Sequence, residues 1–340
     1  MNTNTKKKVT IVGAGAVGAT YAYALAQAGS CSEIAICDMY TSLAIGQVMD
    51  LMQGAVYTPN LSIHVGTDED FKDSDIVVIA VGTRTVEKCD RDTIIYENAM
   101  KIGTIAKRVA ESGCEGIMLI VTNPVDYMTS IAYASSGWTR GRVIGCGTML
   151  DTARLRHILS REFNVSINNV NGYVLGEHGE NEFIAWSLTQ IAGQTVDAFS
   201  KVTGDSGKRV VKNKADILRE ITQSTNHIVN YKGISSYAVA TTLRNITDAI
   251  LRDDNTIMPL SIHLSGEFGI TKCSLSVPCL VGRNGVKRII SAKLSKEERA
   301  AMEVCAKSQL ELASRMYERN KKEFEEAEKS KANKSKTKTK

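Results

Sequence analysis

A glycine-rich loop between a short apolar strand and a helix restricts the fold of this chain more than any other feature. The loop, Gly13-Ala14-Gly15-Ala16-Val17-Gly18, follows the apolar run Val9–Val12. Gly13 permits a tight turn, Gly15 lets the backbone approach a pyrophosphate, and Gly18 allows close packing of the helix on the strand. Ala16 and Val17 lie at the start of that helix, where backbone N–H groups are available to bind phosphate. The pattern predicts a dinucleotide-binding unit, against the alternative of a glycine-rich turn that binds nothing.

An acidic residue at the end of the next strand indicates which dinucleotide is bound. Asp38 follows the predicted strand Glu33–Cys37, twenty residues after Gly18. A carboxylate at this point accepts hydrogen bonds from the ribose 2′ and 3′ hydroxyls and repels a 2′-phosphate. The predicted cofactor is therefore NAD rather than NADP. The alternative is that Asp38 only caps the end of the strand.

Short apolar segments alternate with amphipathic segments through the first 150 residues. Strands are predicted at Val9–Val12, Glu33–Cys37, Ser62–Val65, Ile76–Ala80, Gly116–Val121 and Val143–Cys146, and helices at about 16–29, 42–54, 91–112 and 126–136. Because strands that alternate with helices are joined by right-handed crossovers, they form a parallel sheet with helices on both faces. We therefore expect an α/β fold whose first domain, residues 1–147, is a doubly wound Rossmann sheet.

The pattern changes after about residue 150. Helices are predicted near 149–163, 208–229 and 233–251, followed by antiparallel strands at Ile262–Leu264, Ser274–Leu280 and Val286–Ile290, with a tight-turn signal at Asn284-Gly285. A long helix from Ser295 to about Glu328 follows, with an apolar side made of Met302, Cys305, Leu310, Leu312 and Met316. We expect an α+β substrate-binding domain over residues 148–328 and a disordered, lysine-rich tail over residues 329–340.

Composition excludes several other classes of protein. Hydrophobic residues at 43% and charged residues at 23% are typical of a soluble globular protein. The sequence contains no run of about 20 apolar residues that would predict a membrane span, and no signal peptide is recognised. A cytoplasmic location is therefore expected. The net charge of +5 includes six lysines in residues 329–340, and removing them leaves −1, so neither nucleic acid nor a membrane is an expected partner. The eight cysteines show no metal-binding spacing, and no metal is expected.

One histidine lies in a setting that suits acid–base chemistry. His178 is part of the glycine-flanked acidic segment Gly176-Glu177-His178-Gly179. Asp151 and Arg154 are three residues apart on a predicted helix and therefore share a face. If the His178 loop folds against that face, Asp151 can orient the imidazole and Arg154 can bind a substrate carboxylate. Together the three side chains predict a proton-transfer site for a small acid, although each alone is as readily a cap or a solvated charge.

Two loops at the carboxyl edge of the predicted sheet are further candidates. The polar segment from Gly82 to Arg91 follows an apolar strand, at the edge where ligands bind in such folds. It is either a lid that closes over a substrate or an ordinary solvated connection. Asn123 ends another strand, in Val121-Thr122-Asn123-Pro124, where it binds a ligand oxygen or forms a turn.

These motifs resemble those of the L-lactate/malate dehydrogenase family over about residues 8–326. The resemblance is strongest at Gly13–Gly18 with Asp38, at Thr122-Asn123-Pro124-Val125-Asp126, at Leu150-Asp151-Thr152-Ala153-Arg154, at Gly176-Glu177-His178-Gly179, and at Met258-Pro259 with Gly266-Glu267-Phe268-Gly269. It implies an NAD-dependent enzyme that transfers a hydride between the nicotinamide and a small 2-oxo or 2-hydroxy acid.

The resemblance also implies roles for individual residues. His178 is the acid–base, Asp151 is its partner, and Arg154 binds the substrate carboxylate. Arg91 is the lid arginine that polarises the substrate carbonyl. The other residues implied to line the substrate and nicotinamide sites are Gly82, Thr85, Asn123, Ser235 and Val239.

Two departures from the family concern the substrate. Thr85 stands at a position where lactate enzymes share a glutamine and malate enzymes share an arginine. Without an arginine a second substrate carboxylate has no partner, so malate is disfavoured. Ser235 replaces a threonine usual in lactate enzymes, and the two smaller side chains leave room for a bulkier acid, as in the related L-2-hydroxyisocaproate dehydrogenases. Because the lid has the length of the lactate enzymes, L-lactate is favoured over a bulkier 2-hydroxy acid.

The family is usually tetrameric and sometimes dimeric, so the resemblance implies a homo-oligomer. Arg156 matches an arginine through which bacterial relatives bind fructose 1,6-bisphosphate, but Asn171 replaces the histidine of that site, so weak or absent activation is expected. An NAD-binding protein without catalysis is the alternative from another class. The complete set of Arg91, Asp151, Arg154 and His178 disfavours it.

Overall fold

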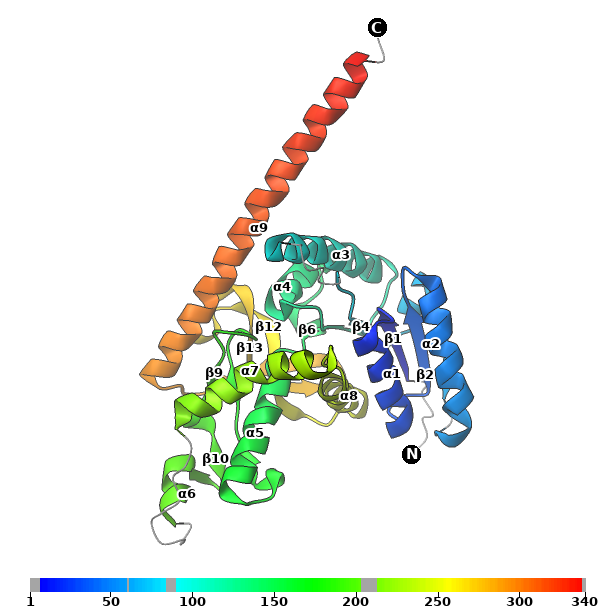
Figure 1. Ribbon diagram of the computed structural model, residues 1–340. Coiled ribbons are helices and arrows are strands. Elements are labelled where there is room, and N and C mark those ends of the chain that lie inside the picture. Colours follow the sequence, from blue (N-terminus) through cyan, green and yellow to red (C-terminus); the bar gives the residue numbers. More distant parts are fainter. Residues whose placement is uncertain (1–6, 60, 84–89, 203–212, 338–340) are drawn as a thin grey trace.

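Six parallel strands form one half of a nine-stranded mixed sheet (Figure 1). The computed structural model describes residues 7–59, 61–83, 90–202 and 213–337. In chain order the parallel strands are β1 (Lys8–Val12), β2 (Glu33–Cys37), β3 (Ser62–Val65), β4 (Ile76–Ile79), β5 (Ile117–Ile120) and β6 (Val143–Gly145). The helices of this half are α1 (Ala16–Ala28), α2 (Thr41–Gly54), α3 (Arg91–Glu111) and α4 (Val125–Ser136). This alternation confirms the predicted doubly wound sheet.

The order of the parallel strands places the loops that were predicted to bind ligands at one edge. The order is β3-β2-β1-β4-β5-β6. β2 and β3 are thus added on one side of β1, and β4, β5 and β6 are added on the other side. Every residue of β1, β4 and β5 is buried, because helices cover both faces of the sheet. The carboxyl ends of β1, β2, β4 and β5 therefore meet at the edge where such sheets bind ligands.

The antiparallel strands continue this sheet. β12 (Thr256–Ser265), β13 (Thr271–Gly282) and β14 (Gly285–Ile289) follow β6, and Ser261 pairs with Gly145 across the junction. A Cβ on Gly145 would lie 2.9 Å from the Cβ of Ser261, so only glycine permits this approach. β12 and β13 extend beyond the predicted Ile262–Leu264 and Ser274–Leu280, and Pro259 and Pro278 lie opposite each other without ending the pairing. The two-residue turn between β13 and β14 is Arg283-Asn284, one residue earlier than the predicted Asn284-Gly285, because Gly285 already pairs with Gly282.

The rest of the second half surrounds the end of the sheet. It comprises α5 (Met149–Phe163), α6 (Val196–Val202), α7 (Lys214–Lys232) and α8 (Tyr237–Arg252), with the short strands β7 (Val170–Asn171), β8 (Val174–Leu175), β9 (Phe183–Ile184), β10 (Gln190–Ile191) and β11 (Gln194–Thr195). β11, β10 and β7 form one small sheet, and β8 and β9 form another. The helix predicted over 208–229 begins at Lys214, where the side chain of Asn213 accepts the N–H of Ala215. Residues 208–212 lie outside the described residues.

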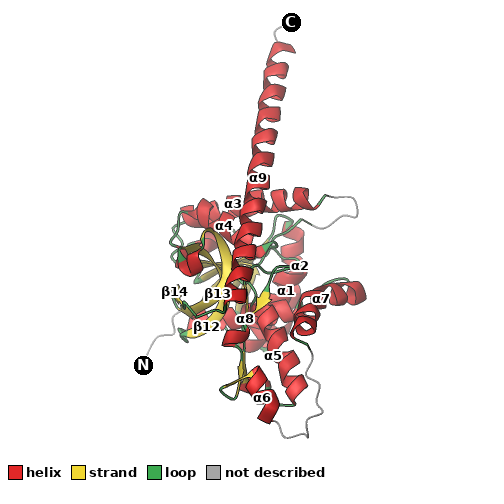
Figure 2. Cartoon of the chain, turned by 90° about the vertical axis from the view of Figure 1, so that its left-hand side faces the viewer, coloured by secondary structure: helices red, strands yellow, loops and turns green. Residues whose placement is uncertain are grey.

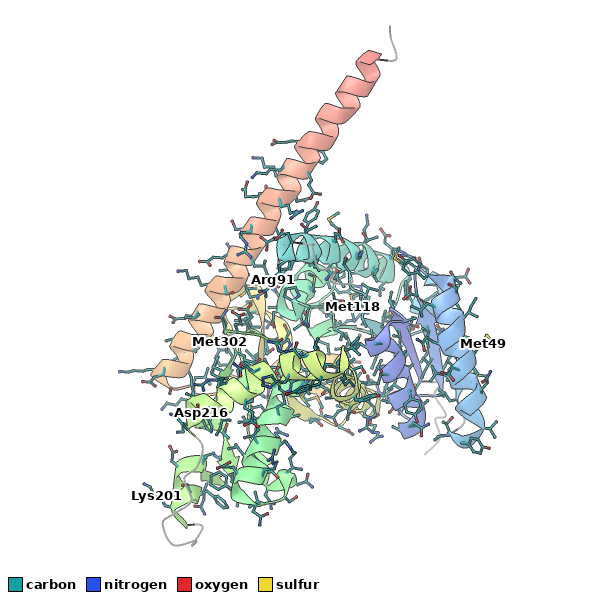
Figure 3. The ribbon with its side chains drawn as sticks, viewed as in Figure 1. Met49, Arg91, Met118, Lys201, Asp216 and Met302 are labelled. Carbon is teal, nitrogen blue, oxygen red and sulfur yellow. The ribbon has the colours of Figure 1, made fainter. Side chains whose placement is uncertain are left out.

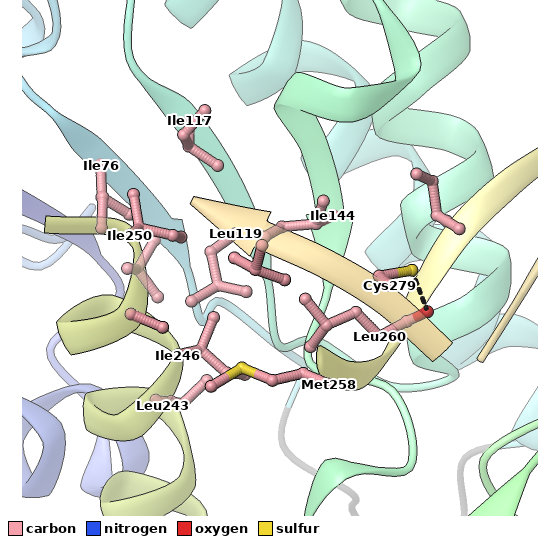
Figure 4. Packing of buried hydrophobic residues seen from close by; sticks show 14 of the residues in the cluster. Ile76, Ile117, Leu119, Ile144, Leu243, Ile246, Ile250, Met258, Leu260 and Cys279 are labelled. Atoms are coloured by element: carbon pink, nitrogen blue, oxygen red, sulfur yellow. Dashed lines mark hydrogen bonds between the residues drawn. The ribbon is translucent and has the colours of Figure 1, made fainter. Parts of the chain in front are cut away.

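One hydrophobic core joins the two halves. Leu119 and Ile144 of the parallel strands pack with Ile246 of α8 and Leu260 of β12 (Figure 4). α8 also packs on α1, where the hydroxyl groups of Tyr21 and Thr247 are 2.5 Å apart. The parallel strands and the second half thus share this buried cluster.

The last helix, α9 (Lys296–Thr337), corrects two expectations. Met302, Cys305, Leu312 and Met316 are buried as predicted, but Leu310 is exposed, because it lies on a different face from these four. The helix also continues past Glu328 as far as Thr337, within the segment predicted to be disordered, and its last turns project away from the rest of the chain (Figures 1 and 2). No glycine or proline occurs after Gly285, and lysine, glutamate and alanine favour a helix, so nothing in the sequence ends it earlier. No helix in the described part of the chain is long and apolar enough to cross a membrane.

Candidate active site

The glycine loop after β1 has the geometry of a phosphate cradle. Gly13 has a φ of +113°, and a Cβ there would lie 2.6 Å from the carbonyl oxygen of Ala80. A Cβ on Gly18 would collide with the carbonyl oxygen of Gly13, whereas Gly15 faces open space. Gly13 and Gly18 are therefore needed for the turn and the packing, and Gly15 leaves room for a ligand.

The N-terminus of α1 is open to an anion. The helix has no side-chain cap at Gly15, and its first backbone hydrogen bond runs from Ala19 to Gly15. The N–H groups of Ala16, Val17 and Gly18 therefore stand at the positive end of the helix dipole without intrahelical acceptors. This arrangement fits the pyrophosphate of a dinucleotide.

Asp38 lies beside this loop, as predicted. Its two carboxylate oxygens accept the N–H of Ala14 at 2.8 Å and the N–H of Tyr40 at 2.9 Å. Each oxygen retains acceptor capacity for a ribose hydroxyl, because a carboxylate offers about four lone-pair sites. The two backbone bonds hold the carboxylate next to the open N-terminus of α1, which fits NAD.

The predicted proton-transfer residues form one connected group. Nδ1 of His178 lies 2.7 Å from Oδ2 of Asp151, and Nη1 of Arg154 lies 2.8 Å from Oδ1 of the same carboxylate. The side chain of Asp151 is 1% exposed, while 26% of the His178 side chain is accessible. Asp151 therefore orients the imidazole from the protein interior and leaves part of the ring accessible to a substrate.

Arg154 retains the means to bind a carboxylate. Its second terminal nitrogen donates to the hydroxyl of Thr225 on α7, at 2.8 Å. Two of its five N–H groups are thus used within the protein, and no other described hydrogen bond uses the remaining three. Thr225 was missed from the sequence, because a threonine within a helix shows no sign of its partner.

The backbone of the His178 loop is held by a second buried carboxylate, which the sequence analysis did not assign. Oδ2 of Asp126 accepts the N–H of His178 at 2.7 Å, and Oδ1 accepts the hydroxyl of Ser261 at 2.6 Å. Asp126 is 1% exposed, and burial raises its pKa to about 6 despite these two hydrogen bonds. The only sequence signal that could have pointed to Asp126 as a site residue was its place in the motif Thr122-Asn123-Pro124-Val125-Asp126.

A third carboxylate, Glu182, lies on the same side of the imidazole as Asp151. Its Oε2 is 3.6 Å from Nδ1 of His178 and accepts the N–H of Gly179 at 3.4 Å. The Glu182 side chain is 1% exposed. It was also missed, because the acidic segment Gly179-Glu180-Asn181-Glu182 is typical of a solvated loop.

The buried charges shift one another's proton affinities. Burial opposes the charged imidazole, but the attraction of Asp151 and the bonds to Asp151 and Glu182 outweigh it and raise the pKa of His178 well above 6.5. Burial likewise raises the pKa of Asp151, but His178 and Arg154 outweigh it, so that pKa is lowered. Burial and the neighbouring charge of Asp151 raise the pKa of Glu182 to about 7. The site therefore favours a protonated His178 beside an ionised Asp151.

The remaining predicted residues lie at the same sheet edge, but no described hydrogen bond joins them to His178. Asn98 on α3 links two of these loops, since its side chain accepts the N–H of Thr83 at 2.8 Å and donates to the carbonyl of Asn123 at 3.4 Å. Gly82 is exposed, with open space around its Cα. Asn123 is also exposed.

Three further residues were predicted to contact the substrate or the nicotinamide. Arg91 is the first residue of α3 and is exposed (Figure 3). Ser235 and Val239 are partly buried, Ser235 before α8 and Val239 within it. The predicted specificity residue Thr85 lies outside the described residues. The roles of all four stay predictions.

Among the residues that the structure describes, two groups of acidic and histidine side chains are compact enough to hold a metal ion, and neighbouring cations account for both. Their members are Asp151, His178 and Glu182 in one group and Glu33, His64 and Asp70 in the other. In the second, the ammonium of Lys8 lies 2.8 Å from Asp70 and supplies the positive charge. In the first, His178 and Arg154 do so. The expectation that no metal is required stays a prediction.

Comparisons with known proteins agree with this geometry. Residues 7–145 match the NAD binding domain of the lactate/malate dehydrogenases, and residues 148–322 match the alpha/beta C-terminal domain of the same family. An L-lactate dehydrogenase of Treponema denticola is 50% identical over 303 residues, which cover 89% of this chain and 96% of that protein. An L-lactate dehydrogenase of Clostridium perfringens is 40% identical over 86% of this chain and 92% of its own length.

Solved structures show the same relationship. A lactate dehydrogenase from a deep-sea metagenome library of the Medee basin superposes with a TM-score of 0.87 at 32% identity, covering 92% of this chain and 99% of the other. The minor L-lactate dehydrogenase of Enterococcus mundtii superposes with a TM-score of 0.86 at 31% identity, covering 91% and 98%. Both family matches and relatives up to 50% identical agree with the contact between His178 and Asp151 and with Arg154 on the same carboxylate, and the chain belongs to the lactate/malate dehydrogenase family.

Proposed function

We propose that this protein is an NAD-dependent L-lactate dehydrogenase that reversibly reduces pyruvate to L-lactate. The observation that supports this most directly is the 2.7 Å contact between His178 and Asp151, with Arg154 on the other oxygen of the same carboxylate. These groups suit a reaction in which a small carboxylate is held while a proton moves to or from its neighbouring oxygen. The relatives named L-lactate dehydrogenase, 50% and 40% identical, support the same substrate.

The proton in this reaction passes through His178. NADH, when bound, supplies the hydride that is added to C2 of pyruvate. Protonated His178 gives the proton on Nε2 to the C2 oxygen, and Asp151 holds Nδ1–H throughout, so the ring keeps its orientation as its charge changes. Solvent then restores the proton to His178. In lactate oxidation neutral His178 takes the hydroxyl proton instead.

Two arginines are assigned to the substrate. Arg154 binds the carboxylate of pyruvate through the N–H groups that Asp151 and Thr225 do not use. We assign Arg91 to the substrate oxygen, where a cation stabilises the negative charge that develops as the hydride arrives. Arg91 is exposed at the N-terminus of α3, at the sheet edge where the other predicted site residues lie.

The choice among 2-oxo acids is assigned to Thr85 and Ser235. Neither side chain carries a charge, so a second carboxylate such as that of oxaloacetate has no partner there, and pyruvate is preferred. A bulkier substrate such as 4-methyl-2-oxopentanoate is the second candidate, because both residues are small. Weak or absent activation by fructose 1,6-bisphosphate stays our expectation, with Arg156 bonded to the carbonyl of Gly172 and Asn171 on the surface.

We further propose that the protein acts as a homo-oligomer, most simply a tetramer and alternatively a dimer. α2 and the 3-10 turn after it present large apolar side chains to solvent, among them Met49, 57% exposed, which points away from the body of the chain (Figure 3), and Tyr57, 92% exposed. Tyr231 and Tyr237, at the junction of α7 and α8, are also exposed. Large apolar side chains that are exposed close together in the sequence, as on α2, are the kind of surface that another subunit can cover.

We place the reaction in the cytoplasm, at the reduction of the pyruvate that glycolysis produces. No nucleic acid or membrane partner is part of the proposal. The test is a comparison of kcat/KM for pyruvate, 4-methyl-2-oxopentanoate and oxaloacetate, each with NADH and with NADPH. The proposal requires pyruvate with NADH to be the best pair. A preference for oxaloacetate would overturn the assignment of Thr85, and absence of turnover with all three would overturn the function.

A further inference from the structure

Within the group formed by Arg154, Asp151, Glu182 and the imidazole of His178, the charges balance when the ring is protonated. Arg154 and a protonated His178 contribute two positive charges, and the ionised carboxylates of Asp151 and Glu182 contribute two negative charges. Asp151 and Glu182 are each 1% exposed, so water screens these charges little. Asp151 alone would already neutralise Arg154, which leaves Glu182 as the counter-charge of the imidazole.

We propose that Glu182 is a positioning residue for the proton of the reaction: its buried carboxylate, second to Asp151 at the Nδ1 side of His178, stabilises the charged imidazole from which the proton leaves. This inference rests on the proposed function. Its geometric basis is the 3.6 Å distance between Oε2 of Glu182 and Nδ1 of His178, together with the N–H of Gly179 that holds the same oxygen.

The loop sequence brings Glu182 to this position. Glu182 follows His178 by four residues, and Gly179, with a φ of +140°, turns the chain between them in a conformation that few other residues adopt. Phe183 and Ile184 of β9 are buried directly after it and draw the end of the loop into the interior. Glu180, by contrast, is exposed.

Other titratable groups around the imidazole do not replace Glu182. Asp126 on α4 holds the backbone N–H of His178 rather than the ring, and Glu177 bonds the side chain of Asn181. Titratable and charged side chains surround His178 in two layers. Those that interact with His178 or its Asp151 partner are Asp126 on α4, Cys146 before α5, Asp151 and Arg154 on α5, and Glu182 on its own loop. Those that interact with Asp126 or with each other are Glu177 on the same loop, Cys273 on β13 and Cys305 on α9.

The protonation equilibrium of this pair follows from its surroundings. When His178 gives its proton to the substrate oxygen, Asp151 and Glu182 face one remaining cation, Arg154, and the site has a net negative charge. This charge favours uptake of the next proton from solvent, by His178 or by Glu182, whose pKa is about 7. The proton balance of each turnover is therefore one proton to the product and one from water.

The test compares the pH dependence of both directions in wild type, Glu182→Gln and Glu180→Gln. The amide introduced by E182Q keeps an oxygen for the N–H of Gly179 and removes the charge, and E180Q removes the same charge from an exposed position of the same loop. Loss of the counter-charge lowers the pKa of His178 by about one unit. For E182Q we therefore expect kcat/KM for pyruvate to fall about tenfold above the transition and to be unchanged below it.

The pH dependence of the effect distinguishes this role from a structural one. The overall equilibrium fixes the ratio of kcat/KM for pyruvate to kcat/KM for lactate at each pH while the cofactor affinities are unchanged, so for E182Q kcat/KM for lactate also falls about tenfold above the transition and is unchanged below it. A merely structural defect lowers both directions at every pH and leaves the transition at the pH of wild type. Glu182→Met, which has similar length and no polar group to bury, is the second variant and must show the same shift of the transition to lower pH if the glutamine variant does not fold.

The outcomes separate this inference from the proposed function. Profiles of E182Q and E182M that coincide with those of wild type and E180Q, in an enzyme that reduces pyruvate, would overturn the role of Glu182 alone. A wild-type protein that does not turn over pyruvate would overturn the proposed function, whatever the variants do.

Discussion

The carboxylate of Asp126 accepts the backbone N–H of His178 at 2.7 Å, so the position of the acid–base residue depends on a side chain of α4, 52 residues earlier in the chain. The other oxygen of Asp126 accepts the hydroxyl of Ser261, which is buried on β12. One side chain thus ties the catalytic loop both to a helix of the cofactor half and to the antiparallel strands.

Removal of this carboxylate destabilises the protein and displaces the loop. Asp126→Ala leaves the N–H of His178 and the hydroxyl of Ser261 without their acceptor, at a cost of about 1–3 kcal/mol for each buried group. We expect the free energy of unfolding in urea to fall by about 2 kcal/mol or more, and kcat/KM for pyruvate to fall at least about tenfold.

The matched control is Asp126→Asn. Its amide oxygen can accept the N–H of His178 and its NH₂ can donate to Ser261, so both bonds survive. The free energy of unfolding of this variant should remain within about 1 kcal/mol of that of wild type. An alanine variant as stable and as active as the asparagine variant would refute the role of Asp126.

The pH dependence of the two directions follows from the raised pKa of His178. Pyruvate reduction needs the charged ring, so kcat/KM is constant at acid and neutral pH and decreases as pH rises through a pKa well above 6.5. Lactate oxidation needs the neutral ring and increases over the same interval. A reduction profile that falls at or below pH 6.5 would be incompatible with the observed surroundings of His178.

Cofactor preference depends on the charge of Asp38. In wild type the carboxylate repels a 2′-phosphate, so NADH is preferred over NADPH. Asp38→Asn keeps an oxygen that can accept the N–H of Ala14 and removes the charge. We expect the ratio of kcat/KM with NADPH to that with NADH to increase about tenfold or more. An unchanged ratio would mean that Asp38 only caps the glycine loop.

The exposed face of α2 is the surface to test for self-association. Met49→Glu places a charge among apolar side chains, which a subunit interface tolerates poorly. Light scattering coupled to size exclusion should show a smaller particle than for wild type. Phe324→Glu, at an exposed site on α9, is the control and should leave the mass unchanged. If Met49→Glu has the mass of wild type, α2 is not the interface.

The local motifs predicted most of the fold and the centre of the site. The loop Gly13–Gly18, Asp38 and the pair Asp151 and Arg154 were recognisable because each motif needs particular residues at fixed short spacing, and the structure brings Asp151, Arg154 and His178 together.

Contacts between distant segments were not predictable in the same way. Thr225 bonds Arg154, 71 residues away in the sequence, and Ser261 pairs with Gly145 across the sheet junction. No local sequence pattern predicts either contact. Glu182 was missed for a different reason. The residues before it, Gly179-Glu180-Asn181, are typical of a solvated loop, and the structure shows that Glu182 is buried together with Phe183. Burial of a charged side chain is a property of the assembled fold.

The central claim is that His178 transfers the proton of a 2-oxo acid reduction, and one comparison tests it most directly. The kcat/KM for pyruvate with NADH is measured for wild type and for His178→Asn, with the Kd of NADH determined for both. We expect the variant to lose several orders of magnitude in kcat/KM, at least the roughly 10²–10⁴-fold that a positioned acid–base contributes, while its Kd for NADH stays close to that of wild type. An asparagine variant within about tenfold of wild type would contradict the account.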